Sequence, residues 1–246
     1  MARMTSSRDL PPFDNSALLL DLDGTLLDIA PRPDAVIVPP SLFATLHSLR
    51  RRLGDALAVV SGRPVEQIEM LLGDAPFAIA GEHGGAIRHG PDQGIERQDM
   101  PSPPASWLSE AERIAASNPG VLLEHKANGF VLHYRAVPEA GLLLLEALEA
   151  LLAGSDRFAL MPARKAWEVK PRGADKGSAV AKIMDRPPFT GRKPMFIGDD
   201  VTDEDGIAMA HALGGVGLLV PATFGDPSRV RAWLERADKE GSWPAW

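Results

Sequence analysis

The chain has 246 residues, of which 45% are hydrophobic and 24% charged, the composition of an ordinary globular protein large enough for one core and a smaller lobe. Its formal net charge of −7 makes nucleic acids and anionic membranes unfavourable partners, and the absence of cysteine excludes disulfides and thiolate chemistry. Residues 1–13 lack the apolar core of a secretory signal and no stretch approaches the length of a membrane span, so we expect a cytoplasmic protein.

The first predicted strand, residues 17–21, leads into the motif Asp-Leu-Asp-Gly-Thr at residues 21–25. Because side chains alternate along a strand, Asp21 and Asp23 can project to the same side at its end. Two carboxylates held so close repel each other and favour a divalent cation with oxygen ligands. One of them can act as a nucleophile while the other moves a proton, which is the chemistry of phosphoryl transfer. The motif alone is weak support, since Asp-Gly pairs mostly mark turns.

A second predicted strand, residues 56–60, runs into Ser61-Gly62-Arg63-Pro64. Proline at a first helical turn, preceded by Ser-Gly, indicates the N-terminus of a helix. The free N–H groups at such a terminus and the Ser61 hydroxyl suit a phosphate oxygen. An ordinary N-cap serine is the simpler interpretation of this position taken alone.

The stretch from about residue 101 to 171 departs from the alternation of strands and helices seen elsewhere. It opens with Pro101-Ser-Pro-Pro104, which is typical of a stiff linker. A helix–strand–strand order then occurs twice, at 105–117, 121–125, 129–135, 138–152, 157–161 and 166–170. This pattern predicts a small α+β lid that closes over a substrate, excludes water and supplies specificity contacts.

A lysine and a second acidic cluster follow the lid. Lys176 precedes a helix-like segment, where its cation can neutralise a phosphate and an attacking aspartate together. The cluster Asp199 to Asp205 comes directly after the apolar strand 195–198. Acidic runs are usually solvated surface, but they rarely follow a short buried strand immediately. Strand-end clusters far apart in sequence converge in a parallel sheet, whose carboxyl ends form the ligand crevice.

The alternation of apolar strands and helix-like segments predicts an α/β fold with a doubly wound, Rossmann-like parallel-sheet core and an inserted α+β cap domain. The core is assigned to residues 1–100 and 173–246, and the cap to residues 101–172. Core strands are predicted at 17–21, 56–60, 77–80, 195–198 and 216–220. Core helices are predicted at 41–53, 64–72, 176–184, 203–212 and 227–238.

These elements, in this order, resemble the haloacid dehalogenase-like phosphatases, and within them the trehalose-6-phosphate phosphatase family. The matching motifs span residues 18 to about 207 and are Leu20-Asp-Leu-Asp-Gly-Thr-Leu26, Val60-Ser-Gly-Arg-Pro64, Ala80-Gly-Glu-His-Gly84, Glu124-His-Lys126, Leu132-His-Tyr-Arg135, Trp167-Glu-Val-Lys-Pro-Arg-Gly173 with Lys176-Gly177, and Gly198-Asp-Asp-Val-Thr-Asp-Glu204. The chain departs from the family pattern at Ile207, where an aromatic is frequent, and at Asp175, where Asn or Ser is expected before the lysine. The resemblance implies a phosphoric monoester hydrolase that converts trehalose 6-phosphate to trehalose and phosphate, the last step of trehalose biosynthesis.

The resemblance also implies roles for the core motifs. Asp21 is expected to attack phosphorus and form an aspartyl-phosphate, while Asp23 protonates the leaving oxygen and then deprotonates the hydrolytic water. Ser61, the Gly62 amide and Lys176 are expected to bind the phosphate oxygens, so that charge spreading in the transition state meets fixed donors.

The implied cofactor is Mg²⁺. Its expected ligands are the Asp21 carboxylate, the Asp23 backbone carbonyl and Asp199, with water and phosphate completing the coordination. Asp203 is expected to orient metal-bound water from the second shell, and Asp200 is left unassigned. Hard oxygen ligands also suit Mn²⁺ and Co²⁺, so the preferred ion is left open.

Recognition of the sugar is assigned by resemblance to Glu124, Lys126 and Glu168 of the cap strands. Glu124 and Lys126 are two residues apart and can share one side of a strand. Without the resemblance, they would be interpreted as a surface ion pair worth less than about 1 kcal/mol. Glu82 and His83, at the end of a core strand, are further candidates for sugar contacts.

Several alternatives remain open at this point. The same core chemistry serves other sugar phosphates, such as sucrose 6-phosphate or mannosyl-3-phosphoglycerate, and a phosphohexomutase would use the same two aspartates. A catalytically inactive module that senses a sugar phosphate is disfavoured, because all the expected catalytic residues are present. Such phosphatases are often fused to a synthase domain; this chain has no room for one, so any synthase partner is expected to be a separate protein. The oligomeric state is left open.

Overall fold

The chain divides into two compact units in a computed structural model that describes residues 10–30, 35–126 and 128–245. The core unit takes the chain up to Gln98 and from Ala174 onward, and the cap unit is Asp99–Gly173. The sequence-based boundaries fall after residues 100 and 172. The roles assigned to the two units, catalysis and specificity, remain predictions.

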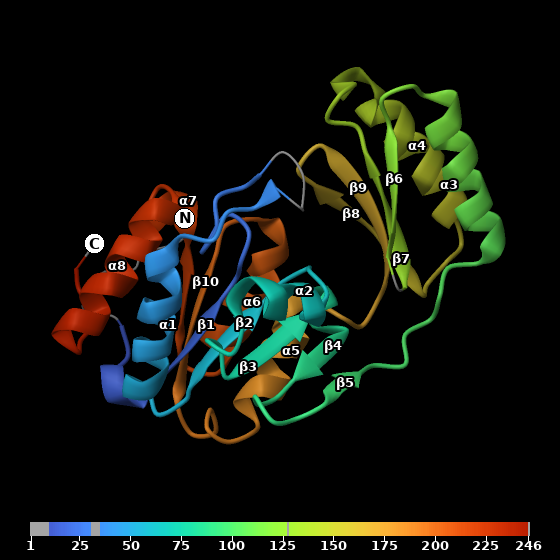
Figure 1. The fold of residues 1–246 in the computed structure, drawn as a ribbon. Helices are drawn as coiled ribbons and strands as arrows, with labels where there is room; N and C mark the ends of the chain where they lie inside the picture. Colours follow the sequence, from blue (N-terminus) through green and yellow to red (C-terminus); the bar gives the residue numbers. More distant parts are fainter. Residues whose placement is uncertain (1–9, 31–34, 127, 246) are drawn as a thin grey trace. The chain divides into compact units, whose positions relative to one another are not determined.

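A seven-stranded sheet forms the centre of the core unit. Its parallel strands are β1 (Ser16–Leu20), β2 (Leu57–Val60), β3 (Ala78–Gly81), β10 (Lys193–Gly198) and β11 (Val216–Leu219). Two antiparallel strands, β4 (Ala86–Arg88) and β5 (Ile95–Arg97), extend it at one edge. The order across the sheet is β11-β10-β1-β2-β3-β4-β5 (Figure 1). The predicted parallel core is confirmed, whereas β4 and β5 were not predicted.

Helices cover both faces of this sheet. They are α1 (Pro40–Arg52), α2 (Val65–Leu72), α5 (Lys176–Met184), α6 (Glu204–Ala212), α7 (Val220–Thr223) and α8 (Pro227–Glu240). Leu18 and Leu20 of β1 pack in one apolar cluster with α1, α2 and α8, and Leu19 packs in a second cluster with α5 and α6. Because both faces are buried, the strand reads as an unbroken apolar run.

The cap unit is a four-stranded antiparallel sheet with two helices. Its elements are α3 (Ala105–Ser117), β6 (Leu122–Lys126), β7 (Gly129–His133), α4 (Gly141–Leu152), β8 (Phe158–Ala163) and β9 (Ala166–Pro171), and the strand order is β6-β7-β9-β8. Both helices pack on one face of the sheet (Figure 1), against Phe130, Leu132 and Val169 among others. Side chains that alternate with these along the strands therefore belong to the opposite face. The predicted helix–strand–strand order, occurring twice, is confirmed.

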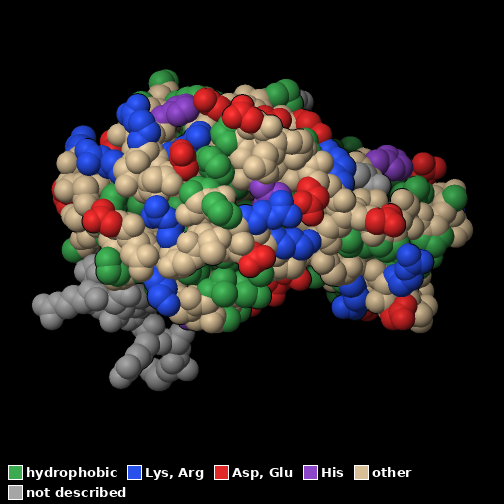
Figure 2. Space-filling model, turned by 90° about the horizontal axis from the view of Figure 1, so that it is seen from below, with side chains coloured by type: hydrophobic (Ala, Val, Ile, Leu, Met, Phe, Trp, Pro, Cys, Tyr) green, Lys and Arg blue, Asp and Glu red, His purple; other side chains and the backbone are tan. Residues whose placement is uncertain are grey.

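Two surface properties bear on the expected partners. Among the described residues, no helix combines the length and apolarity needed to cross a membrane. On the face shown in Figure 2, Lys and Arg side chains are interspersed with Asp and Glu side chains. This mixture of charges is typical of the surface of a globular protein.

Candidate active site

A buried lysine joins two carboxylates at the carboxyl end of the core sheet. Lys176, the first residue of α5, places its Nζ 2.7 Å from Asp21 Oδ1 and 2.5 Å from Asp203 Oδ1. The three side chains are 3%, 5% and 0% exposed, respectively. Burial alone would lower the pKa of Lys176, but the two carboxylates outweigh it and raise the pKa above its ordinary value. The lysine is therefore a fixed cation beside Asp21.

Local structure fixes the positions of Asp21 and Lys176. The Asp21 amide, just beyond β1, donates to the carbonyl of Ile197 on β10 at 2.9 Å, so the nucleophile candidate is part of the strand ladder. Asp175 is the N-cap of α5; its Oδ1 accepts from the Ser178 amide at 2.6 Å, and the Ser178 hydroxyl accepts from the Asp175 amide at 3.3 Å. Aspartate thus fills the N-cap position that the family pattern gives to Asn or Ser, because all three side chains can accept this bond.

Asp203 is engaged at both carboxylate oxygens. Oδ1 meets Lys176, while Oδ2 accepts from the Asp199 amide at 2.9 Å and the Asp200 amide at 3.1 Å. Asp203 closes the short 3-10 helix η6 (Val201–Asp203) that follows β10. It lies so close to Gly198 that an added Cβ there would come within 2.2 Å of its Cγ, which explains the glycine. Asp203 therefore holds the lysine and the acidic loop in place.

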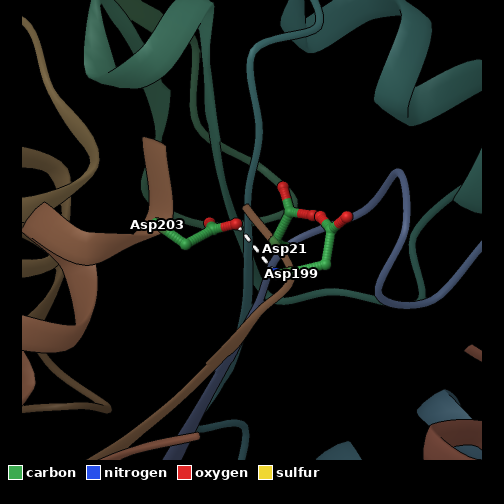
Figure 3. Close-up of side chains that lie close together, drawn as sticks. All are labelled: Asp21, Asp199 and Asp203. Carbon is green, nitrogen blue, oxygen red and sulfur yellow. Dashed lines mark hydrogen bonds between the residues drawn. The ribbon is translucent and has the colours of Figure 1, made fainter. Parts of the chain in front are cut away.

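Asp21, Asp199 and Asp203 form the acidic group of this site (Figure 3). Each offers a carboxylate oxygen, and these oxygens lie within 4.8 Å of one another. Burial, together with the negative charges of Asp200 and Asp203, raises the pKa of Asp199 to about 7. A divalent cation with oxygen ligands would relieve this crowding of carboxylates, so the residues fit the expected metal. Since both oxygens of Asp203 are engaged, Asp21 and Asp199 are the side chains suited to direct ligation.

A glycine brings the two acidic motifs together. Gly24 has a φ of +89°, and an added Cβ would lie 2.1 Å from Asp199 Oδ2. Any larger residue would be strained in this conformation and would displace the Asp199 carboxylate. The glycine of the first motif is thus needed both for the turn and for the approach of the second motif.

Ser61 and Gly62 form a loop after β2, the neighbour of β1. Ser61 is 2% exposed, and its hydroxyl oxygen accepts from the Arg63 amide at 3.2 Å. The Ser61 hydroxyl acts only as an acceptor in this bond, so its hydrogen is available to donate to a ligand oxygen. The N-cap of α2 is Pro64. The interpretation of Ser61 as an ordinary N-cap is therefore wrong.

Glu82 and His83 lie in the 3-10 helix η4 (Glu82–Gly84), directly after β3. Both have a φ of +55°, a left-handed conformation that is uncommon outside glycine. The His83 ring lies against Gly62, where an added Cβ would come within 2.6 Å of Nε2. Glu82 Oε1 instead accepts from Arg97 Nη1 at 2.6 Å, in an ion pair with β5. The structure therefore brings His83, but not the Glu82 carboxylate, to the loop of Ser61 and Gly62.

Asp23 is paired with an arginine rather than with the acidic group. Arg63 Nε lies 2.5 Å from Asp23 Oδ2, and Nη2 lies 2.8 Å from Oδ1. Arg63 was not among the predicted site residues. The one feature of the sequence that pointed to Arg63 was its place in the Ser-Gly-Arg-Pro motif, two residues after Ser61.

The predicted sugar-binding residues of the cap lie on the sheet face opposite α3 and α4. Glu124 on β6 pairs with Val131 on β7, which pairs with Glu168 on β9, so the two glutamates share this face. Glu124 also forms an ion pair with Lys126, and His133 Nε2 lies 2.8 Å from Glu124 Oε2. The hydrogen bond from His133, aided by Lys126 and opposed by burial, lowers the pKa of Glu124 to about 2. His133 thus contacts the predicted set through Glu124.

Sequence comparisons agree on one family, and a structural comparison agrees on the fold. The profile of the trehalose-phosphatase family matches residues 19–232. A probable trehalose-phosphate phosphatase of Sinorhizobium fredii is 42% identical over 209 residues, which cover 85% of this chain and 78% of the relative. The trehalose-6-phosphate phosphatase of Escherichia coli is 37% identical over 205 residues, covering 83% and 77%. The solved C-terminal domain of the C. albicans trehalose-6-phosphate phosphatase has the same fold, with a TM-score of 0.76 at 21% identity over 92% of this chain and 93% of that one.

Proposed function

The chain belongs to the trehalose-phosphatase family and is therefore a phosphoric monoester hydrolase, and we propose that it hydrolyses trehalose 6-phosphate to trehalose and phosphate. The observation that carries the chemistry is the buried Lys176 with its Nζ 2.7 Å from Asp21 Oδ1, at the carboxyl end of the parallel sheet. A carboxylate held beside a fixed cation in a buried site is suited to attack an anionic phosphate.

The first step is the attack of an Asp21 carboxylate oxygen on phosphorus. The bond from phosphorus to the sugar oxygen breaks as the Asp21–phosphorus bond forms, and Asp23 gives its proton to the departing oxygen. The products of this step are trehalose and an aspartyl-phosphate. Lys176 offsets the negative charge of the incoming phosphate, which would otherwise be repelled by Asp21.

Phosphate binding is assigned to the loop after β2 and to α5. The Ser61 hydroxyl, the Gly62 amide and the Lys176 ammonium would donate to the phosphate oxygens. β2 and β1 are adjacent parallel strands, so the loop and the nucleophile both lie at the carboxyl end of the sheet. Donors fixed in this way stabilise the charge that spreads over the phosphoryl oxygens in the transition state.

The second step regenerates the enzyme. Asp23, now a carboxylate, takes a proton from water, whose oxygen attacks phosphorus and breaks the bond to Asp21. Inorganic phosphate leaves, and Asp23 again carries the proton needed for the next turnover. One water is consumed and no oxidation or reduction occurs.

Mg²⁺ is the proposed cofactor, and the carboxylates of Asp21 and Asp199 and the backbone carbonyl of Asp23 would hold it. When bound, it neutralises charge on the phosphate and carboxylate oxygens. Asp203 would support this site without binding the ion directly, because its oxygens accept from Lys176 and from the amides of Asp199 and Asp200.

The cap unit is proposed to recognise the sugar. Glu124, Lys126 and Glu168 place charged acceptors and donors on one face of its sheet, which suits a ligand made of hydroxyl groups. Glu124 and Lys126 are 34% and 30% exposed, so both remain accessible while paired with each other. His83 of the core unit, beside Gly62, is a further candidate contact.

Substrate preference is the direct test of this function. Phosphate release is measured with Mg²⁺ on trehalose 6-phosphate, sucrose 6-phosphate, glucose 6-phosphate and mannosyl-3-phosphoglycerate. We expect kcat/KM to favour trehalose 6-phosphate by about a hundredfold or more, about 2.7 kcal/mol in transition-state binding. Chelation of the metal is expected to stop the release and added Mg²⁺ to restore it. A flat profile would refute the substrate, and no release from any ester would refute the chemistry.

Lys126→Ala tests the role of the cap. We expect kcat/KM for trehalose 6-phosphate to fall about tenfold to a hundredfold, the worth of a charged hydrogen bond. Activity on p-nitrophenyl phosphate, which has no sugar, should change only a few-fold. Lys165→Ala, an exposed lysine in the turn between β8 and β9, is the matched control. Equal losses on both substrates would show that Lys126 does not contact the sugar.

A further inference from the structure

Arg63, which follows the proposed phosphate-binding residues Ser61 and Gly62, forms an ion pair with Asp23, the proposed general acid and base. The Arg63 guanidinium donates from Nε to Asp23 Oδ2 at 2.5 Å and from Nη2 to Asp23 Oδ1 at 2.8 Å. This two-pronged contact fixes the plane of the carboxylate as well as its position. Arg63 is 13% exposed and Asp23 is 34% exposed. The pair is thus sheltered on the arginine side, while the aspartate keeps access to solvent or a ligand.

The backbone of Arg63 also forms two hydrogen bonds. Its amide donates to Ser61 Oγ at 3.2 Å, and its carbonyl accepts from the Glu82 amide at 2.9 Å. The same residue therefore touches the proposed phosphate loop, the turn after β3 and, through its head group, the first acidic motif. Because the backbone and the guanidinium of Arg63 are both hydrogen-bonded, Arg63 fixes the position of the Asp23 carboxylate relative to Ser61.

We propose that Arg63 is the positioning residue for proton transfer by Asp23, an inference that rests on the proposed phosphatase function. Each carboxylate oxygen of Asp23 has two lone pairs and the guanidinium uses one on each oxygen, so an oxygen remains able to carry the transferred proton. In the first step the O–H bond of Asp23 breaks and the O–H bond of the sugar forms. Arg63 keeps all its protons throughout, because a guanidinium does not titrate in proteins.

Loss of this ion pair would leave Asp23 free to rotate. A displacement of about 1 Å in a catalytic group can lower a rate by about a hundredfold. Lysine would not replace the arginine, because an ammonium is a point charge without the planar fork. The effect should also depend on the leaving group. A sugar alkoxide needs a proton in order to depart, whereas p-nitrophenolate departs without one.

The experiment compares kcat/KM of wild type and Arg63→Gln on trehalose 6-phosphate and on p-nitrophenyl phosphate. This parameter covers the steps up to departure of the leaving group, and so excludes hydrolysis of the aspartyl-phosphate. We expect a loss of about a hundredfold on trehalose 6-phosphate and a change of only a few-fold on the aryl ester. Arg63→Lys should resemble Arg63→Gln on both substrates. Equal losses on the two substrates, or recovery with lysine, would overturn the proposal in favour of a simple charge that binds phosphate.

A double-mutant cycle shows whether Arg63 acts through Asp23. In an Asp23→Asn background, Arg63→Gln should cost little further activity on trehalose 6-phosphate, because the group that it positions is already gone. Full additivity of the two losses would contradict the proposal. Arg52→Gln, which breaks the Nε–Oδ1 contact of 2.9 Å with Asp238 elsewhere on the core unit, is the matched control. If wild-type protein fails to hydrolyse trehalose 6-phosphate, the proposed function itself is refuted, whereas an active wild type with equal losses refutes only the role of Arg63.

Discussion

Asp21→Asn is expected to abolish turnover of every phosphate ester while leaving the fold intact. Asparagine has nearly the same shape, and its side-chain oxygen can still accept from Lys176 Nζ, which lies 2.7 Å from Asp21 Oδ1. An amide cannot form the acyl-phosphate, however, so the covalent route is closed. We expect a loss of at least about 10⁴-fold in kcat/KM, equivalent to about 5.4 kcal/mol.

Stability should move much less than activity in this variant. Asp21 belongs to a crowded group with Asp199 and Asp203, so removing one negative charge relieves repulsion as well as weakening the contact with Lys176. Rates on trehalose 6-phosphate and p-nitrophenyl phosphate are measured together with thermal unfolding by circular dichroism. Asp28→Asn, an exposed carboxylate paired with Arg231, is the matched control. Substantial remaining turnover in a folded Asp21→Asn protein would remove Asp21 as the nucleophile.

Strands of the core could be predicted from the sequence where burial on both faces gives a continuous run of apolar residues. Leu18, Leu19 and Leu20 are all buried, so β1 stands out as an apolar run. Strands β4 and β5 lack this pattern. Arg88 is 5% exposed within β4, where its Nε lies 3.1 Å from Glu69 Oε1, and β5 is largely exposed. A buried arginine inside a strand breaks the apolar pattern, and only the folded chain shows that its partner is Glu69 of α2.

The proximity of candidate site residues could be predicted where the course of the backbone alone determines which residues meet. The pair Asp21–Lys176 follows from a strand end and a helix start on neighbouring elements, which a parallel sheet brings to one edge. The partner of Arg63 does not follow in this way, because its long side chain meets an aspartate 40 residues earlier in the chain. The contact between His133 and Glu124 could not be predicted for a related reason. This contact depends on the register of the β6–β7 hairpin, in which Glu124 lies directly opposite Val131.

Lys176→Met is expected to have the largest effect on stability of any substitution in the site. The lysine is 3% exposed and lies between carboxylates that are 5% and 0% exposed. Removing it leaves two buried negative charges without their cation, a change that typically costs about 3–5 kcal/mol. Activity should fall by about 10²–10³-fold as well, since the phosphate loses a fixed donor.

Denaturant unfolding of Lys176→Met measures the expected loss, with Lys182→Met as the control, because this exposed lysine lies in the same helix. The double variant Lys176→Met/Asp203→Asn should recover part of the lost stability. It removes one of the two uncompensated charges, while the amide oxygen can still accept from the backbone amides of Asp199 and Asp200. This recovery should appear without any return of activity, because the cation is still missing. A single variant as stable as wild type would mean that the lysine does not hold the acidic motifs together. A double variant no more stable than the single one would mean that the uncompensated charge of Asp203 is not the cause of the lost stability.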